Sequence, residues 1–130
     1  MINILLADDH AIIRKGLKIF ISSHIAHSEI DEASDGDNAV ERIKQKEYQL
    51  IVLDVNMPGI DSFTLVSTII ALRPDSNILM FTMNAEDIYA RKYLKLGVKG
   101  YLGKASPETE IEKALDNVMN GKRYISPALS

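Results

Sequence analysis

The sequence predicts an α/β fold in which a parallel sheet is covered by helices on both faces. Short apolar runs alternate with helix-period segments along the whole chain, and this alternation is typical of βαβ units. The apolar runs contain few polar residues, as expected of parallel strands that are buried on both faces. The chain has 130 residues, which is enough for a single domain with its own hydrophobic core.

Five apolar runs predict the strands of this sheet. They cover residues 2–7, 29–33, 50–53, 78–81 and 100–103. The clearest of them is Leu50-Ile51-Val52-Leu53, whereas the run at 29–33 is the weakest because it contains three acidic residues.

Apolar residues at spacings of three and four predict a helix after each strand. The residues that mark these helices are Ile13, Leu17, Phe20 and Ile21; Ala39, Val40 and Ile43; Leu65, Val66, Ile69 and Ile70; a weak stripe within 85–96; and Ile111, Ala114, Leu115 and Val118. Pro74 stops the third helix, because the residue before a proline avoids helical angles. Ser106 and Pro107 are predicted as the N-cap and first residue of the last helix, and Gly121 as its end.

Right-handed crossovers leave few ways to connect five parallel strands. We predict the flavodoxin-like strand order 2-1-3-4-5, which places a crevice between strands 1 and 3, where the strand order reverses. Ligands of open α/β sheets bind in that crevice, outside the carboxyl ends of the strands. The functional residues are therefore expected directly after the strands.

Composition excludes several classes of protein. The chain has no cysteine, so it can form neither disulfides nor thiolate metal sites. No apolar run approaches the roughly 20 residues of a membrane span, and residues 1–9 lack the basic start of a signal peptide. A formal net charge of -3 argues against nucleic-acid binding by this chain itself. These features predict a soluble, cytoplasmic domain.

Polar groups follow four of the predicted strands. Asp8 and Asp9 follow the first strand, Asp54 the third, Thr82 the fourth and Lys104 the fifth. Because strands 1 and 3 are predicted neighbours, three carboxylates converge, and their mutual repulsion requires a cation. Mg²⁺ suits such oxygen ligands and accepts a phosphate oxygen as well. Asp54 is then a nucleophile toward phosphorus, while Thr82 and Lys104 bind the transferred phosphoryl group.

The alternative for each acidic residue is a helix cap, since Asp is a favoured N-cap. Asp54 fits that alternative poorly. It directly closes an apolar strand, and the next helix begins only after Met57-Pro58-Gly59, where Asp61 is available as its cap.

On these residues, the sequence resembles the receiver domain of two-component response regulators. It carries an Asp-Asp pair (Asp8, Asp9), an Asp-x-x-Met-Pro-Gly segment (54–59), Thr82 and Lys104, in the order of that family. The resemblance runs from Ile2 to about Lys122. It assigns residues 1–122 to a receiver domain and 123–130 to a tail or the start of a linker. Segments 7–17 and 99–102 resemble the NarL/FixJ (LuxR-type) branch in particular.

The resemblance implies that a sensor histidine kinase phosphorylates Asp54 in a Mg²⁺-dependent reaction. It implies that Asp9, Asp54 and the backbone carbonyl of Asn56 hold Mg²⁺, with Asp8 acting through water. Thr82 and Tyr101 match the coupled switch pair of the family. Such a protein is a signalling switch and not an enzyme, although it assists phosphoryl transfer to its own Asp54 and its slow hydrolysis.

The NarL/FixJ resemblance also implies an output domain. Receivers of that branch precede a DNA-binding helix-turn-helix domain, so this chain is expected to be the front part of a transcription regulator, with DNA bound only by the absent domain. Phosphorylation-dependent homodimers are a further expectation. The alternative is a stand-alone receiver that signals by docking onto another protein.

Two residues depart from the family pattern. Met83 stands where a small residue usually lies beside the phosphorylation pocket, and Ala105 follows Lys104 where many relatives have proline. Met83 is expected to crowd the pocket. His10 is expected at the pocket rim, in the first turn of the first helix.

Two other functions fit an α/β sheet. An aspartyl phosphatase would carry Asp-x-Asp after its first strand, whereas this chain has adjacent Asp8-Asp9. A flavin-binding module would need phosphate loops rich in Ser, Thr and Gly, whereas this edge of the sheet is acidic.

Overall fold

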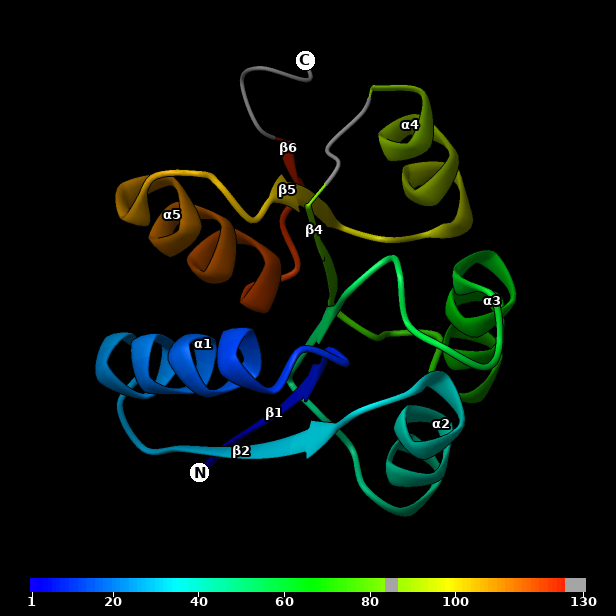
Figure 1. Ribbon diagram of the computed structural model, residues 1–130, viewed down its shortest axis with the longest axis horizontal. Coiled ribbons are helices and arrows are strands. Elements are labelled where there is room, and N and C mark those ends of the chain that lie inside the picture. The colour runs from blue at the N-terminus through cyan, green and yellow to red at the C-terminus, as the bar shows by residue number, and fades with distance from the viewer. Residues whose placement is uncertain (84–86, 126–130) are drawn as a thin grey trace.

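The computed structural model of the chain describes residues 1–83 and 87–125 (Figure 1). The elements are, in chain order, β1 (Ile2–Ala7), α1 (Ala11–His24), β2 (Ser28–Ala33), α2 (Gly36–Gln45), β3 (Leu50–Leu53), α3 (Ser62–Leu72), β4 (Ile78–Thr82), α4 (Asp87–Leu96), β5 (Gly100–Gly103), α5 (Glu108–Met119) and β6 (Tyr124–Ile125). The strands form one sheet in the order β2-β1-β3-β4-β5-β6, and every neighbouring pair is parallel.

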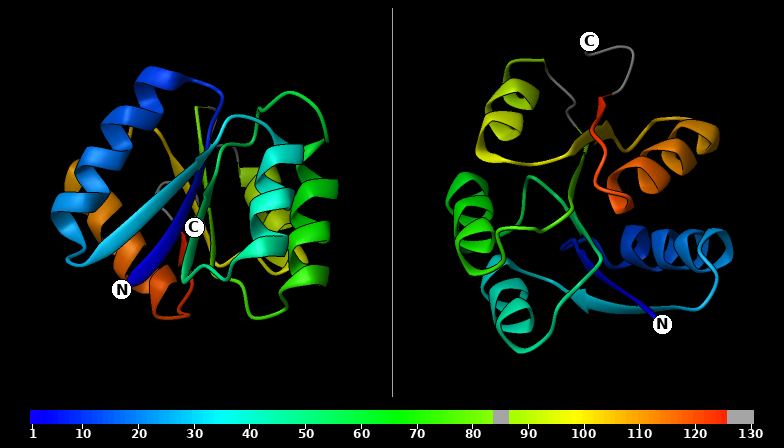
Figure 2. Two further views of the ribbon diagram at one scale, coloured as in Figure 1. Left: turned by 90° about the horizontal axis from the view of Figure 1, so that it is seen from below. Right: turned by 180° about the vertical axis from the view of Figure 1, so that it is seen from behind.

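The sheet lies between two layers of helices. Helices α1 and α5 cover one face, whereas α2, α3 and α4 cover the other, as the left view of Figure 2 shows. Successive side chains of a strand point to opposite faces. Each buried strand therefore supplies both layers: in β3, Ile51 and Leu53 pack toward α2 and α3, while Leu50 and Val52 pack toward α1 and α5. This two-sided burial explains the continuous apolar runs of the sequence.

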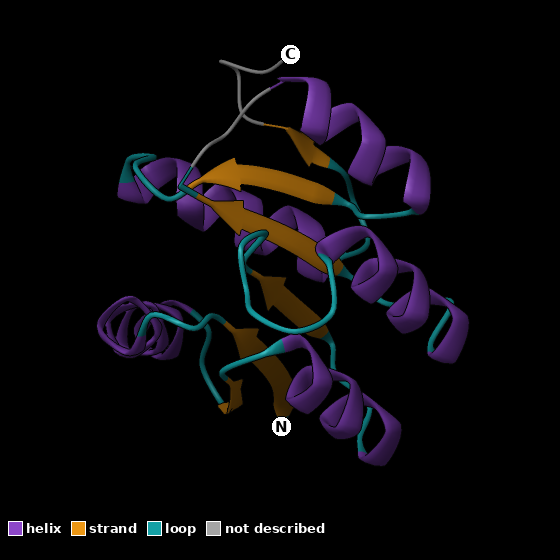
Figure 3. Ribbon diagram, turned by 45° about the vertical axis from the view of Figure 1, so that its right-hand side comes forward, coloured by secondary structure: helices purple, strands orange, loops and turns teal. Residues whose placement is uncertain are grey.

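The predicted fold class, the five predicted strands and their order are confirmed. One strand was not predicted: β6 adds to the edge of the sheet beside β5 (Figure 3). The N–H of Tyr124 donates to the carbonyl of Lys99 at 2.9 Å, and Ile125 is the register partner of Tyr101. Part of the predicted tail, 123–130, is therefore paired with the sheet. The domain boundary itself stays a prediction.

Helix starts follow the local chemistry of capping. The carboxylates of Asp35 and Asp61 accept hydrogen bonds from the N–H groups of Asn38 and Thr64, at 2.7 and 3.1 Å, and cap α2 and α3. The expected start of α5 was wrong by one residue, because Pro107 occupies the N-cap and Glu108 begins the helix. Within the described part of the chain, no helix is both long and apolar enough to cross a membrane.

Candidate functional site

The carboxyl ends of β1, β3, β4 and β5 meet at one edge of the sheet and bring Asp8, Asp54, Thr82 and Lys104 together. Backbone hydrogen bonds fix this arrangement: the N–H of Asp54 donates to the carbonyl of Ala7 at 2.9 Å, and that of Lys104 donates to the carbonyl of Thr82 at 2.7 Å. Each site residue thus continues the ladder between two neighbouring strands. The ends of the sheet therefore set the geometry of the site.

Three carboxylates and one imidazole form a cluster at this edge. Ligand atoms of Asp8, Asp9, His10 and Asp54 all lie within 4.8 Å of one another. The side chains of Asp8 and Asp54 are almost fully buried, at 3 % and 2 % exposed, whereas that of Asp9 lies at the rim. Asp61, rather than Asp54, caps α3, so the cap alternative for Asp54 is excluded.

Lys104 supplies the positive charge of the site. Its Nζ lies 2.6 Å from Asp8 Oδ2 and 3.4 Å from Asp54 Oδ2, and its side chain is 5 % exposed. One ammonium thus faces two buried carboxylates. The pair with Asp8 is the closer one and includes a hydrogen bond.

Asp54 is incompletely satisfied in this environment. Burial raises the pKa of its carboxyl, and the nearby charge of Asp8 adds to this effect, against the opposing attraction to Lys104 and the hydrogen bond from Asn56. Its Oδ1 accepts the Asn56 N–H at 3.3 Å. Its Oδ2 is buried and accepts no hydrogen bond from the residues that the structure describes.

These donors fit a hard divalent cation. The cluster offers carboxylate oxygens, which Mg²⁺ prefers as ligands. Two of its carboxylates, those of Asp8 and Asp54, are buried and share the single positive charge of Lys104. An unsatisfied buried carboxylate oxygen, Asp54 Oδ2, is the kind of group that a metal ion would complete. The acidic residues of the cluster can therefore hold Mg²⁺.

His10 lies at the rim of the site, where the sequence placed it, with its side chain 53 % exposed. It occupies the N-cap of α1, and its Nδ1 lies 3.1 Å from both Asp8 Oδ1 and Asp9 Oδ1 and 3.8 Å from Asp54 Oδ2. The backbone N–H of His10 donates to Asp8 Oδ1 at 2.8 Å, and this local bond turns the ring toward the carboxylates.

Arg14 is a positioning residue that sequence reasoning missed. Its guanidinium donates to the backbone carbonyl of Asp8 at 2.6 Å and to Glu32 Oε1 at 2.9 Å. It thereby fixes the turn that carries Asp8 and Asp9 against the end of β2. Its place one turn into α1, after an acidic pair, was the available signal.

Thr82 and Tyr101 line a cavity together with Asn56, two residues after Asp54. Both are buried, and the cavity has a volume of about 510 Å³. The Tyr101 side chain points inward and is fully buried. Met83 is 64 % exposed, so its side chain does not fill the buried part of the site. The Lys104–Ala105 peptide bond is trans.

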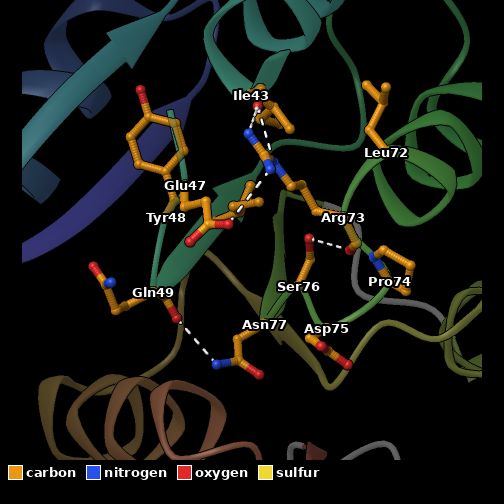
Figure 4. Close-up of a pocket in the computed structure, with 11 residues that line it drawn as sticks. Ile43, Glu47, Tyr48, Gln49, Leu72, Arg73, Pro74, Asp75, Ser76 and Asn77 are labelled. Carbon is orange, nitrogen blue, oxygen red and sulfur yellow. Dashed lines mark hydrogen bonds and ion pairs between the residues drawn. The ribbon is translucent and has the colours of Figure 1, made fainter. Parts of the chain in front are cut away.

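A second cavity, of about 370 Å³, lies at the opposite end of the sheet (Figure 4). Its polar groups already bind one another: the Arg73 guanidinium donates to the carbonyl of Ile43 at 3.2 and 3.3 Å, and Ser76 Oγ donates to the carbonyl of Arg73 at 2.6 Å. These bonds join the end of α2 to the loop before β4. The polar groups that line this cavity therefore have structural roles, and the cavity lies far from the acidic cluster.

Comparisons with known proteins agree with this geometry. Residues 4–116 match the family model described as the response regulator receiver domain. The chain is 32% identical over 126 residues to the response regulator UvrY of Escherichia coli (strain K12), covering 97% of this chain and 58% of UvrY. It therefore spans little more than half the length of that relative.

Two solved structures share the fold at comparable identity. A LuxR-family two-component response regulator from Aurantimonas sp. SI85-9A1 superposes with a TM-score of 0.91 at 28% identity, covering 98% of this chain and 91% of that one. The isolated receiver domain of RcsB from Salmonella enterica serovar Typhimurium, solved with the phosphomimetic BeF₃⁻, gives 0.89 at 25% identity and covers 98% and 95%.

The match to the receiver model covers most of the chain, and the relatives share its arrangement of strands. The chain belongs to the response regulator receiver domain family, in its NarL/FixJ (LuxR-type) branch.

Proposed function

We propose that this domain is a phosphorylation switch in which Asp54 accepts a phosphoryl group from a sensor histidine kinase in a Mg²⁺-dependent reaction. The observation that carries this proposal is the state of Asp54: a buried carboxylate whose Oδ2 accepts no hydrogen bond from the described residues, beside Asp8 and Lys104. A helix cap would satisfy that oxygen with a backbone N–H, whereas here its charged neighbour, Lys104 Nζ, lies 3.4 Å away and is closer to Asp8. A nucleophile has to keep a lone pair available.

In the reaction, an oxygen of the Asp54 carboxylate attacks the phosphorus of the donor's phosphohistidine. A new P–O bond forms, the P–N bond breaks, and its electron pair leaves on the imidazole nitrogen. Such transfers depend on positioning and charge neutralisation more than on covalent chemistry by the protein. Bound Mg²⁺ neutralises the negative charge of phosphoryl oxygens and carboxylates, so that they can approach.

Different residues of the site bind the metal ion and the phosphoryl group. Asp9, Asp54 and the backbone carbonyl of Asn56 would hold Mg²⁺, with Asp8 acting through water. Lys104 exchanges part of its contact with Asp8 for a contact with a phosphoryl oxygen. Thr82, which is buried at the end of β4, donates a hydrogen bond from its hydroxyl to another phosphoryl oxygen.

The output follows from the cavity next to Thr82. Tyr101 lines that cavity, so a movement of Thr82 toward the phosphoryl group changes the packing around the tyrosine ring. The face formed by α4, β5 and α5 then rearranges, which shifts an equilibrium between two conformations. The rearranged surface supports homodimer formation.

We further propose that the chain is the cytoplasmic receiver part of a longer transcription regulator. Its support is that the chain covers only 58% of UvrY and 65% of RcsB in a structure of RcsB bound to DNA. DNA binding would then belong to the rest of that regulator. A stand-alone receiver that docks onto another protein is the second candidate.

Intact mass after incubation with acetyl phosphate tests the phosphoacceptor. We expect one phosphoryl adduct on the wild-type chain with Mg²⁺, and none with EDTA or in Asp54→Ala. A matched variant, Asp61→Ala, removes a carboxylate of the same loop that only caps α3 and should still be labelled. An adduct on Asp54→Ala, or an undiminished one in EDTA, contradicts the proposal.

A further inference from the structure

Three aromatic rings from three elements form a continuous stack next to the phosphorylation site. Phe63 of α3 stacks on Tyr93 of α4 with ring centroids 4.6 Å apart and planes at 9°. Tyr93 in turn stacks on Tyr101 of β5 at 5.8 Å and 24°. Phe63, Tyr93 and Tyr101 are called the aromatic stack below. Helices α3 and α4 lie side by side on one face of the sheet, as Figure 1 and Figure 2 both show.

Tyr93 is the centre of the aromatic stack and is also anchored by its hydroxyl. The ring is 1 % exposed, and its hydroxyl is hydrogen-bonded to Ser62 Oγ. Burial raises the pKa of this phenol, so it stays neutral and able to donate. A buried phenol normally has a hydrogen-bond partner, and Ser62 supplies it here.

The aromatic stack connects the switch tyrosine to the loop that carries Asp54. Ser62 and Phe63 directly follow Asp61, which ends that loop as the cap of α3. Asn56, Ser62, Phe63, Tyr93 and Tyr101 all line the same cavity. On the outer side, Lys92 Nζ lies 5.9 Å above the Phe63 ring, which adds a favourable cation–ring contact.

We propose that Tyr93 is a positioning residue of the switch: it holds Tyr101 inward and couples its position to the loop between β3 and α3. The geometry gives a route from the acidic cluster to β5 that runs through Asn56, Ser62 and Tyr93, in addition to the route through Thr82. The effect of Tyr93 on phosphorylation rests on the proposed function, whereas its positioning of Tyr101 does not.

The inward position of Tyr101 bears on the switch. If the inward arrangement is the one that accompanies phosphorylation, the aromatic stack stabilises it. A ligand that selects this arrangement then binds more tightly, because a smaller fraction of the protein has to change conformation. Removing the aromatic stack reverses this gain.

Tyr93→Leu tests the positioning of Tyr101 in metal-free protein. With ¹³C-labelled tyrosine, the Tyr101 ring signals of the wild type should be shielded from a neutral gadolinium chelate, and in Tyr93→Leu they should broaden. The control is Ile21→Val, which removes core volume from the opposite face of the sheet. Tyr101 signals that stay protected in Tyr93→Leu overturn the proposal.

Binding of BeF₃⁻ at fixed Mg²⁺ tests the coupling. Loss of one aromatic contact predicts about two- to tenfold weaker binding in Tyr93→Leu relative to Ile21→Val. Tyr93→Phe keeps the aromatic stack and loses only the hydrogen bond to Ser62. BeF₃⁻ binding should therefore weaken by the same smaller factor in Tyr93→Phe, in Ser62→Ala and in the double variant. Additive effects, or Tyr93→Leu binding as tightly as the control, overturn the coupling.

Failure of the proposed function would look different. Wild-type protein that binds no BeF₃⁻ with Mg²⁺ would refute the phosphorylation switch. In that case the exposure of Tyr101 in Tyr93→Leu still decides whether Tyr93 positions it.

Discussion

Replacing Lys104 by methionine removes the cation of the site while keeping much of the buried side-chain volume. The change leaves Asp8 and Asp54 facing each other across the crevice without their shared partner, which lies 2.6 Å from one carboxylate and 3.4 Å from the other. Because both carboxylates are nearly inaccessible to water, the surrounding solvent screens them poorly. We expect metal-free Lys104→Met to be clearly destabilised at pH 7.

The size of the effect follows from these distances. At an effective dielectric constant of about 20, each contact is worth about 5–6 kcal/mol of Coulomb energy. Methionine also relieves the desolvation of the ammonium, and Asp54 can take up a proton in response. We therefore expect a net loss of about 3 kcal/mol, at the low end of the range for breaking a buried pair. In a domain of this size that loss lowers the unfolding temperature by roughly 10–15 °C.

Magnesium should restore most of this loss. A divalent ion bound by the carboxylates supplies the missing charge, and a concentration of about 100 times its Kd stabilises a folded protein by about 2.7 kcal/mol. The gain should be larger in Lys104→Met than in wild type, because the lysine no longer repels the ion. Thermal unfolding in EDTA and in saturating Mg²⁺ measures both quantities.

Lys99→Met is the matched control. Lys99 Nζ donates to the neutral Oδ1 of Asn77 at 2.6 Å, away from the acidic cluster, so its loss should be about 1 kcal/mol and independent of Mg²⁺. If Lys104→Met unfolds at the wild-type temperature in EDTA, or if Mg²⁺ leaves its loss of stability unchanged, Lys104 does not neutralise the two carboxylates.

Three further predictions concern single residues. Burial raises the pKa of the Asp54 carboxyl in the folded protein. The protonated carboxyl therefore contributes to the free energy of unfolding fully below the unfolded-state pKa of about 3.9, and this contribution is lost as the pH rises through the folded-state pKa. Metal-free Asp54→Asn should thus melt above wild type at pH 7, and the gain should vanish below about pH 4; equal melting at pH 7 contradicts this. His10→Ala should alter Mg²⁺ affinity measured by calorimetry, since the ring contacts Asp8 and Asp9, and an unchanged Kd would place His10 outside the metal site. Gly100→Ala should cost about 1–3 kcal/mol by denaturant unfolding, because its Cβ would lie 2.6 Å from Val118; wild-type stability would show that the core yields.

The strands that are easiest to predict from the sequence are those that are buried on both faces of the sheet. Runs such as Leu50–Leu53 and Ile78–Phe81 are buried on both faces, so their apolar character alone indicates strands. The pair Tyr124–Ile125 carries no such signal, because two residues show no periodicity and their pairing depends on β5. Pro107 differed from its predicted position by one residue, within the usual uncertainty of helix ends.

The residues of the site also fall into those that the sequence predicts and those that it does not. Asp8, Asp54, Thr82 and Lys104 could be predicted because each directly ends or follows a strand, and parallel strands end at one edge. The ring of His10 enters the cluster through the geometry of a turn, which spacing does not encode.

Tyr101 is the clearest case of a property that the sequence does not encode. Its ring stacks on Tyr93, which in turn stacks on Phe63 of a different helix. Contacts between distant segments of this kind are read from the fold and not from local pattern. The same holds for Arg14, whose contact with Glu32 joins α1 to β2.

Asp54, and no other group of the acidic cluster, is predicted to accept the phosphoryl group. Borohydride reduces an aspartyl phosphate to homoserine, so tandem mass spectrometry of the reduced, digested protein identifies the residue that carried it. After incubation with acetyl phosphate and Mg²⁺, we predict homoserine at position 54 alone, and none when EDTA is present. Homoserine at Asp8 or Asp9, or a stable phosphoryl group on His10 with residue 54 unchanged, would contradict this account of the site.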